Sequence, residues 1–210
     1  MPYKFIIVVT LALAIAVGSF VARVRWTKNQ ASERLLKLLH HLKNQGVNVS
    51  LLKKGDLQPR IETRDILKYT SRSEDIVEIK EKSINYVFAD CITGKNTTIY
   101  YIDYVVISAN QFTTNSYKTT KLVKKRSFPI FGKVLDLEWK GDQMLANSLN
   151  NDYSLKAKLI KSPEINKLTC NPVIYPRPDY EYYKIRIRYL LPTSDFFEAL
   201  NSVGTHLKFL

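Results

Sequence analysis

The chain has 210 residues, 45% of them hydrophobic, and a formal net charge of +13. This length and apolar content fit one globular domain, and two cysteines exclude a disulfide-dense scaffold. The positive charge is concentrated, because residues 23–72 contain 12 Lys/Arg and 4 Asp/Glu, a net of 12 − 4 = +8. Such a charge suits an anionic membrane surface or a nucleic acid.

The first element is an apolar segment of 18 residues, Phe5–Ala22, without a charged side chain. A helix of this length extends roughly 27 Å, close to the ~30 Å of a bilayer's hydrocarbon core. Tyr3 and Trp26 flank the segment, where aromatic rings favour the membrane interface. The segment is long for a cleaved signal, whose apolar region usually has about 7–15 residues. Residues 1–28 are therefore predicted to be a retained transmembrane anchor, with a cleaved signal or a buried core helix as alternatives.

A basic segment follows the apolar one and supplies the candidate membrane-surface residues. Each basic side chain near an anionic leaflet contributes roughly 1 kcal/mol. Only Lys4 precedes the apolar segment, so the positive-inside rule predicts a single-pass cell-membrane protein with a cytoplasmic C-terminal domain. In the opposite orientation, Cys91 and Cys170 become a candidate disulfide pair. The candidate membrane-surface residues are Arg23, Arg25, Lys28, Arg34, Lys37 and Lys43.

Residues 29–72 are predicted to be an amphipathic helix and a basic connector. Within residues 30–45, four leucines recur at helical spacing, Ser32 can cap the start and Gly46 can end the helix. This helix can pack its leucines on the domain or continue the membrane helix. It can also lie on the lipid surface or pair with its own copy.

From residue 73 the hydrophobic period changes to two, which indicates strands. The strongest is 98–108, which is apolar on both faces except at Asp103 and is therefore expected at the centre of a sheet. Gly94 is expected to supply a positive φ in a hairpin turn before it. Lysines along 119–126 indicate an exposed edge strand. The other strands are predicted at 76–82, 84–92, 134–139, 165–175 and 180–191.

The helical period returns in the C-terminal half. Asp142 and Asp152 are predicted to cap helices over 142–150 and 152–161, and Thr193 or Ser194 a last helix over 194–208. Residues 73–210 are therefore expected to form an α+β domain, an antiparallel sheet with helices in its C-terminal half, preceded by the single transmembrane helix.

The strand at 180–191 has two distinct faces. Its odd positions are apolar and predict a core face, whereas its even positions are aromatic and basic. An aromatic and basic face can stack bases and hold phosphates, and it can equally be an ordinary solvated surface. Asp103, if buried, is expected to pair with a Lys or Arg of a neighbouring strand. The candidate ligand strip is Tyr180, Tyr182, Lys184, Arg186 and Arg188.

No recognisable catalytic, cofactor-binding or metal-binding set accompanies these features. His40 and His41 lack the convergent partners of a metal site, Ser50 and Lys53 match only a bare S-x-x-K spacing, and phosphate-binding glycine motifs are absent. We therefore expect a membrane-anchored protein with a non-catalytic interaction domain. Its expected partners are the lipid bilayer, other proteins or copies of itself. The alternatives are a tethered enzyme of unrecognised class and a nucleic-acid or polyanion binder.

Overall fold

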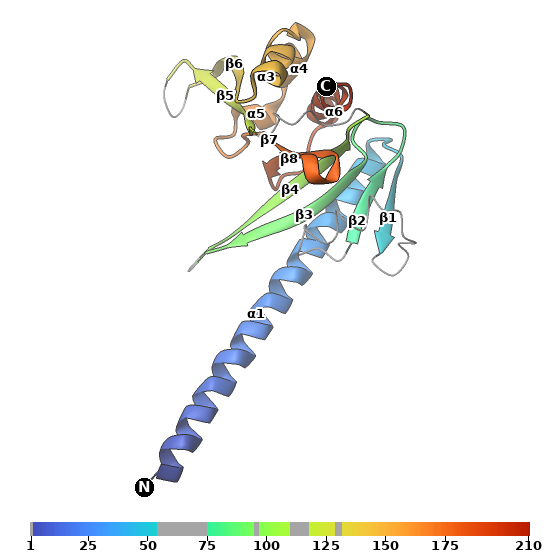
Figure 1. Ribbon diagram of the computed structural model, residues 1–210. Coiled ribbons are helices and arrows are strands. Elements are labelled where there is room, and N and C mark those ends of the chain that lie inside the picture. Colours follow the sequence, from blue (N-terminus) through green and yellow to red (C-terminus); the bar gives the residue numbers. More distant parts are fainter. Residues whose placement is uncertain (1, 54–74, 95–96, 110–117, 129–131) are drawn as a thin grey trace.

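The computed structural model describes residues 2–53, 75–94, 97–109, 118–128 and 132–210, with side chains from residue 13 onward. It is an α+β protein in which one open antiparallel sheet of eight strands carries helices from the C-terminal half (Figure 1). The predicted α+β class and antiparallel sheet are confirmed.

The chain begins with α1, Pro2–Asn44, a single helix of 43 residues. Its last third packs against β1, β2 and β3 of the sheet. Gly46 follows the helix with φ of 79° and donates its N–H to the Lys43 carbonyl (2.9 Å), which confirms the predicted stop. The predicted start at Ser32 is wrong, because the helix runs through it without interruption. The buried side chains of this third are Ala31, Leu35, Leu38, Leu39 and Leu42.

The sheet has the strand order β1-β2-β3-β4-β8-β7-β5-β6, with every neighbouring pair antiparallel. Because β8 lies between β4 and β7, it joins strands from the two halves of the chain. The strands are β1 (Val49–Lys53), β2 (Asp75–Ile79), β3 (Tyr86–Thr93), β4 (Thr98–Ile107), β5 (Thr120–Arg126), β6 (Val134–Lys140), β7 (Val173–Arg177) and β8 (Tyr182–Arg188).

The predicted central position of residues 98–108 is confirmed, because β4 pairs with β3 and β8. The prediction that residues 119–126 form the edge is wrong, since β5 pairs with both β6 and β7. The edge strands are β1 and β6. On β6, Trp139 N donates to Asn150 Oδ1 (2.7 Å) and Asn150 Nδ2 donates to the Trp139 carbonyl (3.0 Å). The Asn150 amide thus satisfies edge groups that a further strand would otherwise bond.

Five helices are described, and three of the four in the C-terminal half begin at the predicted caps. Asp142 accepts from Leu145 N (3.0 Å), Asp152 from Leu155 N (2.8 Å), and the Thr193 hydroxyl from Phe196 N (3.4 Å). The predicted strand at 165–175 starts only at Val173, because a short helix occupies its beginning. These helices are α3 (Gln143–Asn150), α4 (Tyr153–Lys161), α5 (Pro163–Asn166) and α6 (Ser194–Lys208), with a 3₁₀ turn, η1 (Pro178–Tyr180).

The two faces of the sheet differ. One face packs against α1 and α6 in a large core in which Tyr104 meets Phe197, with ring centroids 6.4 Å apart. The other face has a smaller apolar cluster around Phe88 and Tyr182. In Figure 1 the N-terminal part of α1 projects away from the domain, and the β3–β4 hairpin extends as an arm in the same direction. The N-terminal part of α1 and the hairpin arm therefore lie on the same side of the domain (Figure 1).

The β3–β4 turn is closed by a hydrogen bond from Gly94 N to the Thr97 carbonyl (2.7 Å). Among the described residues, positive φ values of glycine occur at Gly46 and Gly141. The predicted positive φ at Gly94 is therefore wrong, and this turn does not depend on glycine for its backbone conformation.

Candidate membrane-contact surface

Every residue of α1 from 13 to 26 is exposed. A protein in water seldom leaves so continuous an apolar segment uncovered, so the segment marks a contact with lipid or with another protein. A helix that is apolar around its whole circumference suits surroundings that are apolar on all sides, rather than a groove that takes one stripe. The large exposed side chains are Leu13, Ile15, Val17, Phe20, Val21, Val24 and Trp26.

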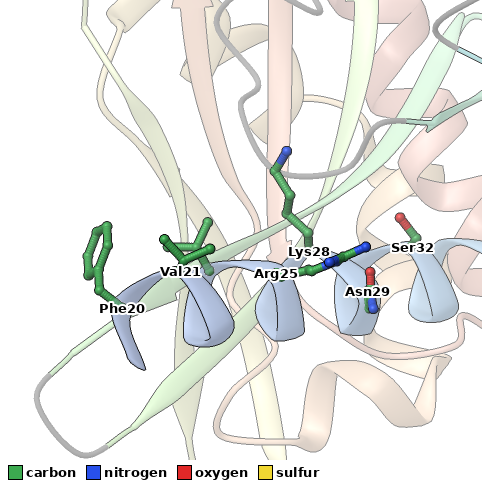
Figure 2. A pocket seen from close by; sticks show the side chains of 7 residues that line it. Phe20, Val21, Arg25, Lys28, Asn29 and Ser32 are labelled. Carbon is green, nitrogen blue, oxygen red and sulfur yellow. The ribbon is translucent and has the colours of Figure 1, made fainter. Parts of the chain in front are cut away.

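The polarity of α1 changes along its axis over a short distance. A hollow of about 490 Å³ lies along the helix. Its lining changes along the helix from apolar to basic and polar side chains (Figure 2). Its two ends, Phe20 and Ser32, are separated by roughly 18 Å of helix. A bilayer interface has the same order, from hydrocarbon to anionic headgroups to water. The lining residues are Phe20, Val21, Val24, Arg25, Lys28, Asn29 and Ser32.

The tip of the β3–β4 hairpin contacts α1 at this transition. Arg23 Nη2 donates a hydrogen bond to the Gly94 carbonyl (3.1 Å). A hollow of about 270 Å³ lies between the two elements, with Phe20 and Val24 on the helix and Thr93 and Gly94 on the hairpin. The contact fixes the level of the hairpin tip along the helix.

The predicted membrane-surface residues separate into two groups. Arg23, Arg25 and Lys28 surround the end of the apolar segment. Lys37 and Lys43 are exposed, but they lie roughly 16 and 26 Å beyond Trp26 along the helix. These distances exceed the ~8 Å Debye length of physiological salt, so a membrane ending near Trp26 attracts the second group weakly.

Arg34, the sixth predicted residue, belongs to the domain. Its guanidinium carbon lies 4.1 Å from the ring centroid of Tyr100 and 5.0 Å from that of Tyr189. Its carbonyl also accepts a hydrogen bond from the Tyr189 hydroxyl (3.3 Å). These cation–π contacts stabilise the junction between α1 and the sheet. Sequence spacing alone could not separate this arginine from its neighbours on the helix.

The candidate ligand strip on β8 is largely occupied by internal contacts. Tyr182 and Lys184 are buried, with 2% and 9% of their surface exposed. Arg186 donates from Nε to Asp103 Oδ1 and from Nη2 to Asp103 Oδ2, both at 2.6 Å. Nη2 also donates to Asp90 Oδ2 at 2.6 Å. The expected partner of Asp103 on a neighbouring strand is therefore Arg186.

Burial disfavours the charged form of Arg186, but the carboxylates of Asp103 and Asp90 outweigh it and raise the pKa of the guanidinium. Lys184 Nζ lies 3.5 Å from Asp103 Oδ2, yet burial lowers the pKa of this amine. Two carboxylates and two cations leave no excess charge for a polyanion. Of the remaining strip residues, Tyr180 is half-buried and Arg188 is exposed.

The structure contains one hydrogen-bonded network, Ser148–His206–Asp152, that was not predicted from the sequence. The Ser148 hydroxyl and His206 Nδ1 are 2.8 Å apart, and His206 Nε2 lies 2.9 Å from Asp152 Oδ2. Burial raises the pKa of Asp152, but hydrogen bonds from His206 and Leu155 N outweigh it, and the pKa is lowered. This network links α3, the start of α4 and α6. Asp152 was predicted as a cap, but nothing local connects it to a histidine 54 residues away.

Within the described residues, the histidines and cysteines have surroundings other than a metal site. In the described parts of the chain, no group of three or more His, Cys, Asp or Glu side chains is placed to hold an ion. Cys91 and Cys170 are buried and do not form a disulfide, and burial raises the pKa of Cys170 to about 11. His41 instead contacts the Pro192 carbonyl, with Nε2 and the oxygen 2.6 Å apart.

From residue 13 onward, no described helix has both the length and the apolarity needed to cross a membrane. Residues 5–12 of the predicted span lie outside the described side chains. Comparisons with protein-family models, with curated proteins and with solved structures each find no significant match to this chain.

Proposed function

We propose that this chain is a single-pass membrane protein whose N-terminal helix anchors a non-catalytic α+β interaction domain at an anionic membrane surface. The observation that carries the proposal is the exposed apolar segment 13–22 of α1, which is followed by Arg23, Arg25 and Lys28. In the sequence this segment continues to Phe5 without a charge. Residues 5–22 together match the length of a bilayer's hydrocarbon core.

The continuity of α1 supports an anchor that also positions the domain. Because one helix contains both the exposed segment and the leucines buried on the sheet, the domain is held at a fixed distance from the apolar segment. A flexible linker would separate the two parts, but none interrupts the helix between residues 26 and 31. We infer that the domain meets its partners, other proteins or further copies of this chain, close to the membrane surface.

The orientation in the proposal rests on charge. Basic residues follow the apolar segment and only Lys4 precedes it, so the positive-inside rule favours a cytoplasmic domain. Buried cysteines without a disulfide, Cys91 and Cys170, are compatible with either compartment. Protease treatment of sealed cells that express the chain with a C-terminal tag tests this orientation. A protected tag supports the proposal, and a tag lost from intact cells reverses the orientation.

The anchor is tested by replacing Ala14 and Val17 with Arg in the full chain. A charged side chain at the centre of a transmembrane helix costs about 2.5–3.5 kcal/mol, so the double variant should leave the carbonate-washed membrane fraction. The matched control replaces Leu135 and Leu168, which are 61% and 53% exposed on the domain. Arginine at these two positions should leave retention unchanged. Equal retention of both double variants would contradict the anchor.

A tethered hydrolase is a second candidate, favoured by the Ser148–His206–Asp152 chain. Here Asp152 can orient the imidazole while the other ring nitrogen accepts the Ser148 proton. Ser148, however, lies inside α3, where backbone N–H groups bond to preceding carbonyls and are not presented to an oxyanion. We therefore assign a structural role to the Ser148–His206–Asp152 network. Labelling by a serine-reactive fluorophosphonate that Ser148→Ala abolishes would reverse this assignment.

A further inference from the structure

We propose that the tip of the β3–β4 hairpin is a second membrane contact, which inserts an apolar pair of side chains into the headgroup layer of an anionic bilayer. This inference rests on the proposed anchor and adds a site that the anchor does not require. A single helix is sufficient to hold a domain at a membrane, whereas a second contact also fixes the domain's tilt.

The hairpin tip lies beside the end of the apolar segment. The bond from Arg23 to the Gly94 carbonyl (3.1 Å) and the hollow shared with Phe20 place the hairpin tip beside the last turns of the apolar segment. Figure 1 shows the hairpin reaching beyond the rest of the sheet in that direction. Any plane that leaves residues before Ala22 in hydrocarbon therefore passes close to the tip.

The outer part of the hairpin presents an apolar pair of side chains. Ile92 is 52% exposed, and its partner in the β3–β4 register is Ile99. Directly opposed residues share a face, so these two isoleucines form one apolar pair. On the same face of the hairpin, the next pair toward the domain is Asp90 with Tyr101. The exposed apolar pair therefore lies between these polar residues and the Thr93–Thr98 pair, which is nearest the turn.

The charge around this apolar pair favours a lipid surface over a protein partner. Residues 91–99 contain no Asp or Glu, and Arg23, Arg25 and Lys28 lie at the same level on the helix. The acidic residue nearest to the pair on its face, Asp90, is paired with Arg186. An apolar pair beside the basic side chains of α1 suits anionic headgroups above hydrocarbon. A second copy of this chain would bring the same positive charges against themselves.

The strand pairing of the hairpin also supports such a contact. Strands β3 and β4 pair at eight successive positions up to Thr93 and Thr98. On the other side of β4, pairing with β8 extends from Tyr101 to Ile107 and anchors the base of the hairpin in the sheet. A tip paired in this way can transmit the position of the membrane surface to the centre of the domain.

The test uses the full chain in phosphatidylcholine vesicles that contain phosphatidylglycerol. A small fluorophore is attached to single variants Phe20→Cys, Ile92→Cys and Leu135→Cys, and is quenched by nitroxide lipids labelled near the headgroup. Wild type measures background labelling, which should be low because Cys91 and Cys170 are buried. Thr97→Cys, also exposed at the tip, replaces Ile92→Cys if that variant does not fold.

We expect strong quenching at positions 20 and 92 and only background quenching at position 135. Quenching at position 20 without quenching at positions 92 or 97 would overturn the hairpin contact and leave the anchor intact. Absence of quenching at all positions would overturn both. The fluorophore at position 92 could instead be protected from water in a way that depends on protein concentration and persists in detergent. That result would identify a second copy of this chain as the contact in place of lipid, and it would also overturn the proposal.

Discussion

The two halves of α1 share one helix and differ in what surrounds them. Residues 31–42 place five apolar side chains at 0–5% exposure against the sheet, whereas the apolar side chains of residues 13–26 are 38–68% exposed. Burial in the domain explains why residues 31–42 carry these apolar side chains. The second half needs an apolar environment that the described domain does not supply. We propose that a membrane supplies this environment, so that the two segments of one helix lie in different surroundings.

The largest expected effect tests whether only the packed half stabilises the domain. Leu35→Ala removes a fully buried side chain and should lower the free energy of unfolding by about 2–5 kcal/mol. Ile15→Ala, at 65% exposure, should change it by less than about 0.5 kcal/mol. Urea unfolding in detergent measures both. Equal losses would mean that residues 13–26 also pack on the domain.

A second pair of variants separates two arginines of the same helix. Arg34→Ala removes contacts with Tyr100 and Tyr189 and should cost about 1–2 kcal/mol of domain stability with little dependence on salt. Arg25→Ala should leave stability unchanged and weaken binding to anionic vesicles by roughly 1 kcal/mol, an effect that salt suppresses. Vesicle flotation at two salt concentrations, beside unfolding curves, measures both. The distinction fails if Arg34→Ala weakens only vesicle binding.

The end of the packed half supplies a smaller effect. Gly46 has φ of 79°, a conformation in which a side chain costs roughly 1 kcal/mol. Gly46→Ala should lower the unfolding free energy by that amount, although nothing lies within 4 Å of the added carbon. Gly18→Ala in the exposed half also meets nothing within 4 Å and has no positive φ, so it is the matched control. A loss at Gly18 as large as at Gly46 would contradict this explanation.

The smallest effect is a pH dependence confined to the domain. Because the folded-state pKa of Asp152 is lowered, its contribution to stability is present above its unfolded pKa and is lost as pH falls through the folded value. Asp152→Asn should therefore reduce the acid-side fall in stability and leave membrane retention unchanged. Melting temperatures of both proteins across the acidic range measure this difference. An unchanged pH profile would remove Asp152 from the explanation.

Local signals predicted local structure well. Helix caps at Asp142, Asp152 and Thr193 and the stop at Gly46 occur as expected, because each depends on residues within one helical turn. The central place of residues 98–108 was readable because a strand buried on both faces is apolar on both faces. These inferences required no knowledge of distant contacts.

Long-range pairing was not readable from the sequence. Lysines on residues 120–126 suggested an edge, yet β5 lies inside the sheet because β6 and β7 pair on its two sides. The basic face of β8 looked available to a ligand, but Arg186 is held by Asp103 and Asp90, residues 83 and 96 positions away. A pattern of period two assigns a face to a side chain and says nothing about what the neighbouring strand brings to that face.

The most direct test of the central claim is a cysteine-accessibility scan along α1 in sealed membranes. Ile15→Cys and Val17→Cys should resist a charged, water-soluble maleimide until detergent is added. Lys37→Cys and Lys43→Cys should react once the compartment that contains the domain is accessible, without detergent. This boundary between residues 17 and 37 is what we predict from the two environments of the helix. Reaction at all four positions before detergent would contradict the membrane anchor.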